Sequence, residues 1–517
     1  MTLATTYNMP HFLQAGPFRV RYENGFLRYV SLGDTEILRM IYFAIRNRNW
    51  TTAAFTITDE VIEQHADSFR IHYGWHIDDL SIQMTGWVDI RGEADGTITV
   101  DFYGKALNDF QKNRIGLCVL HPLDGVLGQP AEVISPDGRI ANDNFPVFIN
   151  PHQPFLNIQT LRWKPASGTV WQLDFSGDVF EMEDQRNWTD ASFKTYSTPN
   201  SLPFPVAVSA SEEFRQNVVF GLSKQAIPNG VAVVETPEKV IEFNPTRPRI
   251  GVGQRTDGPP LTNTELALLK KLSLSHLRAD VFFRFRFWQT LLTNAIKDAQ
   301  RLGVPLELAV FFGNEPANEL GALQGFLQNH DVTVRSMMLY HTETLTTSNE
   351  LLQTLVPLLR SEWPGLLIGG GTDDNFAELN RNLVDFELVD FVSYSITPAA
   401  HASDNLTIQE NIAGQPETVL SARRFSNGKP IHISPITLRP RFTTRAGTVV
   451  ERLNALADPR QTTEFGADWT RQSLSALTTI GVESITYYQS HGPSGLVSGD
   501  TVYPVFNVIQ EYQNGAR

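Results

Sequence analysis

The feature that most constrains the fold is a change of pattern near the middle of the chain. Before about Leu222, apolar and polar residues alternate with period two in short runs such as 18–22, 27–31, 68–73 and 96–103. Turn signals such as Glu23-Asn24-Gly25 separate these runs, and this combination is typical of antiparallel strands. Many such strands over roughly two hundred residues predict a large β-sandwich or supersandwich. One exception is the Pro-, His- and Gln-rich stretch 145–165, which predicts a long ordered loop.

After about Pro248 the pattern becomes a strand–helix alternation. Helical patterns occupy 262–272, 287–302 and 348–360, and Thr262 with Glu265 has the spacing of a capping box. Strand candidates lie at 249–253, 276–280, 306–312, 334–340, 366–370, 391–395, 431–435 and 484–488. Eight strands with intervening helices over about 260 residues predict a TIM-like (β/α)8 barrel. An open doubly wound sheet is the alternative, but no Gly-rich phosphate fingerprint supports it.

The predicted organisation is therefore a multi-domain β plus α/β protein. We expect an N-terminal β-sandwich at 1–225, a linker at 226–248 that includes a short strand at 231–235, and the barrel at 249–517. The total of 517 residues agrees, because chains divide into several domains beyond roughly 250–300 residues.

Composition excludes several classes of function. The net charge of −14 disfavours binding to nucleic acid or to an anionic membrane surface. No apolar run approaches the roughly 18 residues of a membrane span, and residues 1–16 lack the pattern of a signal peptide. Cys118 is the only cysteine and lies in an apolar run, so we expect a buried free thiol. A cytoplasmic protein is the expectation, and a homo-oligomer is compatible with the sequence.

Carboxylates, cations and aromatic rings are concentrated between Phe180 and Tyr196. A sugar-like ligand needs both kinds of group, because rings stack on C–H faces and charged groups bind hydroxyls. The alternative is a structural ion-pair network on an irregular loop. The binding candidates in this segment are Asp184, Arg186, Trp188, Asp190 and Lys194.

Polar side chains also lie at the ends of almost every predicted barrel strand, as Arg278 and Asp280 do at the end of the second. Because barrel enzymes carry their chemistry at the C-terminal ends of the strands, the set predicts a polar pocket at the barrel mouth. Each residue taken singly is equally typical of a solvated loop. His341, His401 and His432 lack the spacing of a metal motif, so we expect neither a metal nor a cofactor.

Several segments resemble signatures of the D-apionate lactonase family. They are 181–196, 370–381, 394–402, 434–442, 458–461, 465–470 and 486–488. The resemblance covers both halves of the chain in order. It implies an N-terminal β domain followed by a TIM-like barrel, and hydrolysis of D-apionolactone to the aldonic acid in apiose catabolism. In the family pattern a Glu follows the paired tyrosines, whereas Gln489 stands there in this chain.

Lactone hydrolysis needs a base for water, donors for the oxyanion and groups that hold the sugar hydroxyls. No Gly-x-Ser-x-Gly elbow is present, so we expect direct attack by water. The candidates for the base are Glu378, Asp373, Glu183 and His401. Arg439 and Arg441 are candidates for the oxyanion or, with Arg381, for the carboxylate product; salt bridges between loops are the alternative. Asn380, Tyr488 and Gln489 complete the predicted substrate-binding set.

Two questions stay open at the level of sequence. The 181–194 segment either forms its own site, as in mutarotase-like supersandwiches, or completes a pocket shared with the barrel mouth, which we favour. The second question is the reaction. A glycoside hydrolase-like barrel acting on a plant or bacterial saccharide would need facing carboxylates, such as Glu315 with Glu343 or Glu378. A non-catalytic sugar-binding protein would need none.

Overall fold

The computed structural model describes residues 10–165, 168–227, 247–256, 258–442 and 457–515. The chain divides into two compact units. The first, called the β unit, comprises Met1–Gln185 and Ser192–Thr236, and the second, called the barrel unit, comprises Arg186–Ala191 and Pro237–Arg517. Most of the predicted linker, with its short strand, lies outside the described residues. The predicted boundaries stay predictions.

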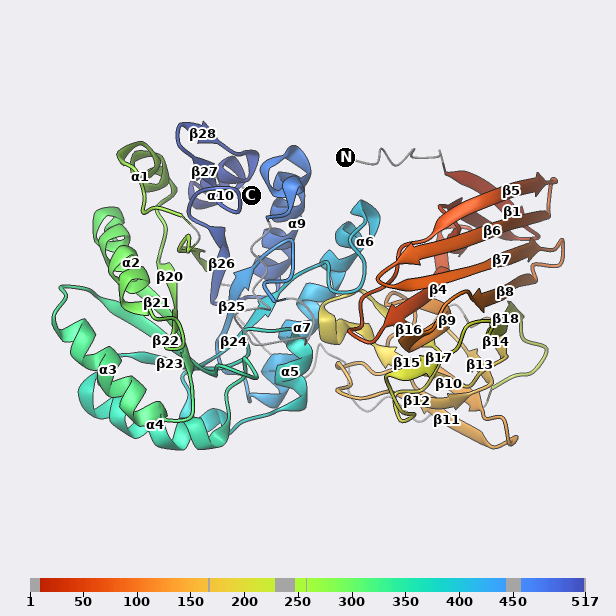
Figure 1. Cartoon of the computed structure of the whole chain (residues 1–517), viewed down its shortest axis with the longest axis horizontal. Helices are drawn as coiled ribbons and strands as arrows, with labels where there is room; N and C mark the ends of the chain where they lie inside the picture. The colour runs from red at the N-terminus through yellow and green to blue at the C-terminus, as the bar shows by residue number, and fades with distance from the viewer. Residues whose placement is uncertain (1–9, 166–167, 228–246, 257, 443–456, 516–517) are drawn as a thin grey trace. The chain divides into compact units, whose positions relative to one another are not determined.

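The β unit is built from two nine-stranded antiparallel sheets (Figure 1). The first contains, in spatial order, β1 (His11–Ala15), β2 (Phe18–Glu23), β3 (Phe26–Leu32), β4 (Thr35–Asn47), β9 (Phe110–Pro122), β16 (Ser192–Tyr196), β15 (Phe180–Asp184) and β12 (Phe155–Ile158), with β17 (Val206–Val208) paired to β9. The second contains β11 (Ile140–Asn144), β10 (Pro130–Ile134), β13 (Thr160–Trp163), β14 (Trp171–Ser176), β18 (Glu213–Leu222), β8 (Ile98–Ala106), β7 (Ile82–Gly92), β6 (Phe69–Asp79) and β5 (Thr56–Gln64).

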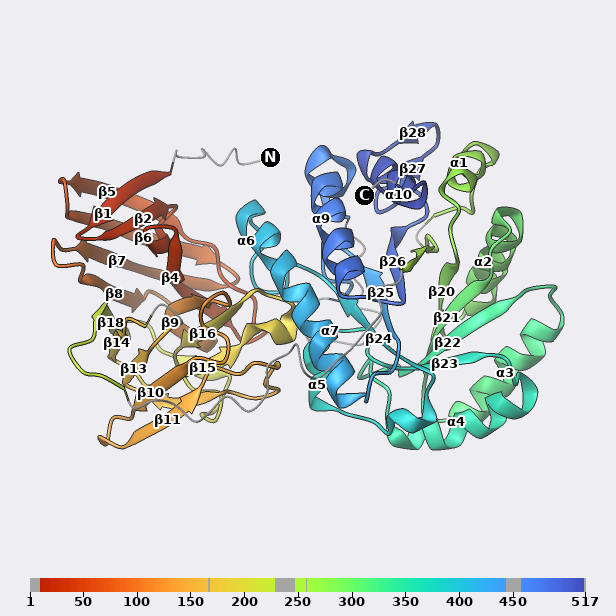
Figure 2. The same cartoon turned by 180° about the vertical axis from the view of Figure 1, so that it is seen from behind.

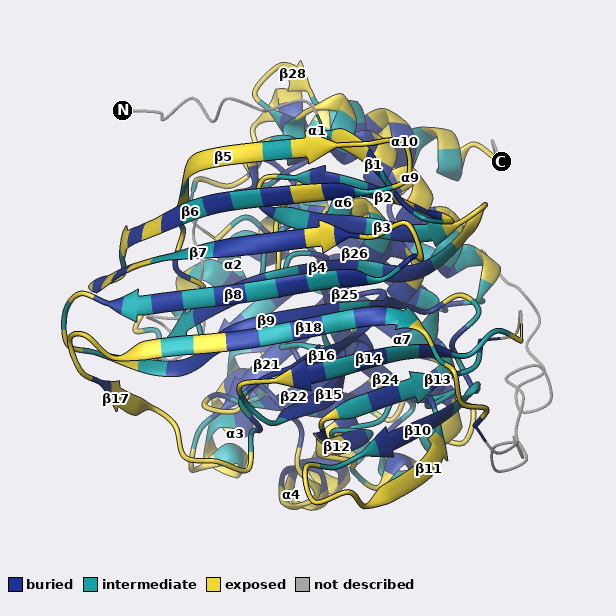
Figure 3. Ribbon diagram, turned by 90° about the vertical axis from the view of Figure 1, so that its right-hand side faces the viewer, coloured by how far each residue is buried: buried dark blue, intermediate teal, exposed yellow. Residues whose placement is uncertain are grey.

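Aromatic side chains join the two sheets face to face. Phe43 on β4 packs 5.1 Å, centroid to centroid, from both Trp75 on β6 and Phe102 on β8. Burial alternates along β6 and β8, as period-two sequence requires, whereas the edge strand β5 is exposed along most of its length (Figure 3). The predicted antiparallel sandwich is confirmed, and Cys118 is a buried free thiol.

The prediction of a loop throughout 145–165 was wrong. Strands β12 and β13 lie within this stretch, and their apolar residues Phe155, Ile158, Leu161 and Trp163 are buried. Each strand has only four residues, so its apolar pattern is too short to be recognised among the surrounding Pro, His and Gln residues.

The barrel unit contains a closed parallel barrel (Figures 1 and 2). Its strands are β19 (Arg249–Gly253), β20 (Leu277–Phe282), β21 (Leu306–Phe312), β22 (Val334–His341), β23 (Leu367–Gly371), β24 (Phe391–Ile396), β25 (Ile431–Ile436) and β26 (Ser484–Gln489). The α-helices are α1 (Asn263–Leu269), α2 (Trp288–Leu302), α3 (Pro316–Gln328), α4 (Asn349–Glu362), α5 (Phe376–Arg381), α6 (Asn405–Glu410), α7 (Gly414–Phe425), α9 (Glu464–Thr479) and α10 (Pro504–Gln513).

Short elements complete the chain. The 3-10 turns are η1 (Gln185–Trp188), η3 (Lys270–Leu272), η4 (Phe386–Leu388), η5 (Asn411–Ala413) and η6 (Pro459–Thr462), and β27 (Val497–Ser498) pairs with β28 (Thr501–Val502). The eight strands close on themselves, which confirms the barrel and excludes the open doubly wound sheet.

Local signals in the sequence explain where helices begin. The Thr262 hydroxyl accepts from the Glu265 backbone, and the Glu265 carboxylate accepts from the Thr262 backbone at 2.9 Å, so the predicted capping box is present. At the start of α4, the Ser348 hydroxyl accepts from the backbone N–H of Leu351. Every residue of β21 is buried, as expected for a strand covered by helices on one face and by barrel interior on the other. No described helix has the length and hydropathy needed to traverse a bilayer.

Candidate active site

Four charged side chains meet at the C-terminal end of the barrel. Arg278 and Asp280 lie on β20, Asp373 follows β23, and Arg441 follows β25. Arg278 donates through Nε to Asp280 Oδ1 at 2.9 Å and through Nη2 to Asp373 Oδ1 at 2.8 Å. Arg441 closes the set by pairing with the second oxygen of each carboxylate. We call these four residues the charge ring.

Burial and charge act against each other in this ring. Burial raises the pKa of Asp373 more than its two guanidinium partners lower it. Burial also opposes ionisation of Asp280, but Arg278 and Arg441 outweigh it and lower the pKa of that carboxyl. Arg278 and Asp373 are fully buried, whereas 17% of the Arg441 side chain is exposed. Arg441 is therefore the cation of the ring that a ligand can reach.

A second arrangement, an Asp–His pair, lies beyond the end of β24. His401 Nδ1 is 2.5 Å from Asp190 Oδ2, and the Asp190 side chain is only 5% exposed. The other oxygen, Asp190 Oδ1, accepts from Asn411 Nδ2 at 2.7 Å, and Asn411 Oδ1 accepts from the Ala191 backbone. We call Asp190 and His401 the dyad. A buried carboxylate of this kind holds one ring nitrogen protonated and so orients the other to accept a proton.

The segment Arg186–Ala191 supports this dyad within the barrel unit. Arg186 is fully buried and donates to Glu417 on α7 at 2.8 Å. The Trp188 ring packs edge-on against His401, with centroids 5.1 Å apart, and the Arg381 guanidinium lies 5.1 Å from the centroid of Trp188. Asn380 Nδ2 donates to the Asn187 side chain at 3.0 Å.

The structure thus groups many of the predicted residues. Asp373 and Arg441 meet in the charge ring, and a second group contains Arg186, Trp188, Asp190, Asn380, Arg381 and His401. Arg186, Trp188 and Asp190 come from the segment Arg186–Ala191, whereas the other members of the two groups follow β23, β24 and β25, which are consecutive strands of the barrel.

Other predicted residues lie elsewhere. Glu183 pairs with Lys194 across β15 and β16 in the β unit, where Asp184 accepts from the Asn150 backbone at 3.0 Å. In the barrel unit, the buried Tyr488 hydroxyl lies 2.8 Å from Thr470 Oγ1 on α9. Arg439 Nε lies 3.8 Å from Asp458.

Two more candidates are partly accessible. Glu378 lies half-buried in the first turn of α5, and Gln489 is the half-buried last residue of β26. Their positions alone do not test the predicted roles, so Glu378 as a base and Gln489 as a substrate-binding residue stay predictions.

The sequence places Arg278 and Asp280, two residues of the charge ring, at a strand end but predicts no role for them. Arg278 and Asp280 are two apart on β20, so both side chains point to the same face of the strand. His276, which is buried, lies two positions before Arg278. This alternation at 276, 278 and 280 is the sequence signal that would have placed all three side chains on the inner face of the barrel.

The carboxylates required by the glycosidase alternative are held by local partners. Glu315 accepts from Asn318 at 2.6 Å on the first turn of α3, and Glu343 pairs with Arg284. Glu343 and Arg284 are both more than 40% exposed. Among the described residues, no three His, Cys, Asp or Glu side chains are grouped so as to hold a metal ion.

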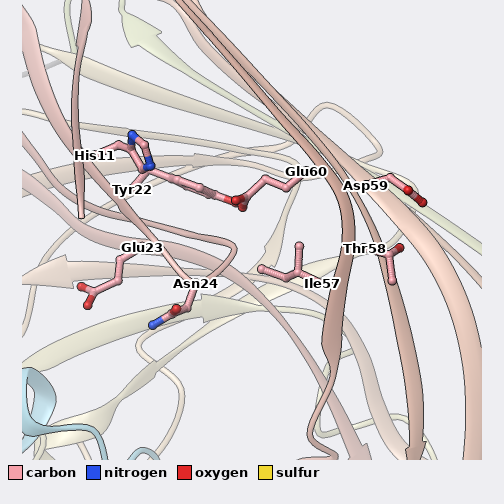
Figure 4. Close-up of a pocket in the computed structure, with 8 residues that line it drawn as sticks. All are labelled: His11, Tyr22, Glu23, Asn24, Ile57, Thr58, Asp59 and Glu60. Atoms are coloured by element: carbon pink, nitrogen blue, oxygen red, sulfur yellow. The ribbon is translucent and has the colours of Figure 1, made fainter. Parts of the chain in front are cut away.

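The β unit has a separate polar pocket of about 210 Å³ (Figure 4). Tyr22 and Glu60 meet in it through a side-chain hydrogen bond. Its lining residues are His11, Tyr22, Glu23, Asn24, Ile57, Thr58, Asp59 and Glu60. None of the predicted site residues lines this pocket.

Sequence comparisons relate both halves of the chain to one family. Residues 2–225 match the family model of the D-apionate lactonase N-terminal domain, and residues 250–517 match that of the D-apionate lactonase TIM barrel domain. A D-apionate lactonase of Brucella anthropi is 28% identical over an alignment of 517 positions. The alignment covers 95% of this chain and 84% of that protein.

Solved structures are more distant. A β-glucuronidase from Ruminococcus gnavus in complex with D-glucaro 1,5-lactone is 7% identical, with a TM-score of 0.37 over 92% of this chain and 69% of that one. A GH30 endoxylanase from Clostridium papyrosolvens is 12% identical, with a TM-score of 0.36 over 53% and 73% of the two chains.

Proposed function

The chain belongs to the D-apionate lactonase family, and we propose that it hydrolyses a neutral sugar lactone of the D-apionolactone type to the aldonic acid. Lactone hydrolysis in sugar catabolism follows from the family. The identity of the sugar and the roles of individual residues are our proposal.

The observation that carries the mechanism is the Asp190–His401 dyad. A water molecule becomes an effective nucleophile at neutral pH when a positioned base takes its proton during attack. Asp190 accepts from Nδ1 of His401, and we assign the role of that base to the other ring nitrogen, Nε2. The buried carboxylate also stabilises the imidazolium that forms.

Arg441 is proposed to bind the oxygen that gains charge. When water attacks the lactone carbonyl, the carbonyl oxygen becomes an oxyanion, and a preorganised cation lowers the energy of that state. Asp280 and Asp373 hold the Arg441 guanidinium from two sides, so it needs little reorganisation at the moment of reaction. The ring C–O bond then breaks, and His401 returns its proton to the leaving alkoxide. The product is a hydroxy acid, which ionises.

The other predicted bases are less suited to this step. Asp373 is fully buried and each of its oxygens accepts from a guanidinium group, so neither oxygen is placed to contact the attacking water. Glu183 pairs with Lys194 in the other unit. Glu378 remains the second candidate, because it lies half-buried after β23.

The first test is acid release from a panel of aldonolactones that includes D-apionolactone, followed with a pH indicator. For the active lactone, His401→Gln and Asp190→Asn should each lower kcat/KM by about 10²-fold or more, because general-base catalysis is worth about that much. His65→Gln is the matched control, since His65 is exposed in the turn between β5 and β6 of the β unit.

The outcomes separate the two parts of the proposal. If wild-type enzyme accelerates hydrolysis of no lactone, the proposed function is wrong. If wild-type enzyme is active and His401→Gln retains its rate, His401 is not the base, and Glu378→Gln becomes the next variant.

A further inference from the structure

A chain of buried contacts continues from the charge ring into the barrel interior. Arg278 Nη1 donates to Ser434 Oγ on β25 at 3.2 Å. Ser434 Oγ in turn donates to Glu307 Oε1 on β21 at 2.7 Å. All three residues are at most 2% exposed. The contacts cross the barrel, because β25 is a neighbour of neither β20 nor β21 in the strand order.

Glu307 is an ionised anchor in this interior. Burial would raise its pKa, but nearby His276 and His432 together with the Ser434 hydroxyl outweigh burial and lower the pKa of the carboxyl. Burial lowers the pKa of His276 to about 4, so that ring is neutral near pH 7. At neutral pH, Ser434 and Ser336 are hydroxyl donors to the two carboxylate oxygens.

The orientation of Arg278 is determined by three partners in three directions. Its Nε donates to Asp280, its Nη2 donates to Asp373, and its Nη1 donates to Ser434. A guanidinium is planar and its donors are fixed relative to one another, so restraining Nη1 also restrains the two bonds to the carboxylates. Those carboxylates in turn hold Arg441.

We propose that Ser434 and Glu307 are positioning residues for Arg441, acting through Arg278, Asp280 and Asp373. The inference rests on the proposed role of Arg441 at the oxyanion. Neither residue touches the substrate. Their effect is to keep the exposed guanidinium at the place where charge develops, so their removal should lower kcat and leave KM nearly unchanged.

Two serines on the same carboxylate provide the test. Ser434 and Ser336 are both buried and both donate to Glu307, at 2.7 and 3.2 Å, but only Ser434 is bonded to Arg278. With the active lactone, Ser434→Ala should lower kcat at least tenfold with KM within twofold, whereas Ser336→Ala should change kcat less than twofold. Glu307→Gln, which removes the charge and keeps the shape, should lower kcat at least fivefold.

A double-mutant cycle excludes a general loss of folded enzyme. Such a loss would reduce the rate by the same factor in any background. If Ser434 acts through Arg441, Ser434→Ala should reduce kcat less than twofold when Arg441 is already Ala. Equal reductions in the two backgrounds, or equal effects of the two serine variants, would overturn the inference. Even then, the proposed function would still hold if the wild-type enzyme hydrolyses the lactone and Arg441→Ala is slow.

Discussion

At the scale of single residues, burial affects the ionisable groups of this protein in two opposite ways. Arg278 is buried beside the partly buried Asp280, and their attraction outweighs burial, which raises the pKa of the guanidinium and lowers the pKa of the carboxyl. His121 on β9 is buried among aromatic rings, and burial lowers its pKa to about 3. The first kind of burial preserves charge for binding, whereas the second makes folding sensitive to acid.

The sign of that sensitivity follows from the pKa of His121 in the two states. Below about pH 6.5 the unfolded chain takes up a proton on this imidazole, whereas the folded chain does so only near pH 3. Stability is therefore lost as the pH falls through this window, by on the order of 1 kcal/mol per pH unit. In His121→Gln, the free energy of unfolding should depend less steeply on pH between 6 and 4. Urea titrations of the whole chain at several pH values measure this slope, and equal slopes would contradict the assignment.

At the scale of elements, α1 shows how much a short helix depends on its first turn. Its seven residues follow the Thr262 cap, and Glu265 also accepts from the Gly499 backbone at 2.9 Å. Thr262→Ala should destabilise this helix by about 1 kcal/mol, since the side-chain bond to the Glu265 backbone is lost. Amide hydrogen exchange at residues 263–269 should accelerate about fivefold. Thr262→Ser keeps the hydroxyl and should leave exchange unchanged, so faster exchange in that variant would rule out the cap as the cause.

Elements also differ in how well their sequences predicted them. The barrel strands were recognisable because short segments rich in apolar residues alternate with helical patterns along this half of the chain. Strands β12 and β13 were not, since each has only two buried positions. In such short strands, pairing with β15 and β14 decides the conformation more than local pattern does.

At the scale of the whole molecule, net charge bears on the nature of the substrate. The chain carries −14 at pH 7, so a charged ligand would meet a long-range field that salt screens, whereas a neutral lactone would not. We expect kcat/KM for the active lactone to change less than twofold between about 20 and 200 mM salt. The measurement is the initial rate at low substrate concentration over that range. A several-fold dependence would indicate that the substrate is charged.

The sequence by itself determined the two architectures, because period-two alternation and strand–helix alternation are local properties of the chain. It also indicated that polar residues gather at the ends of the barrel strands. Only the tertiary structure decided which of them meet. Arg278 and Asp373 are 95 positions apart and Asp190 and His401 are 211 apart. Alternation tells which face of a strand a side chain occupies, but the partner across the barrel depends on closure and register, which no local pattern records.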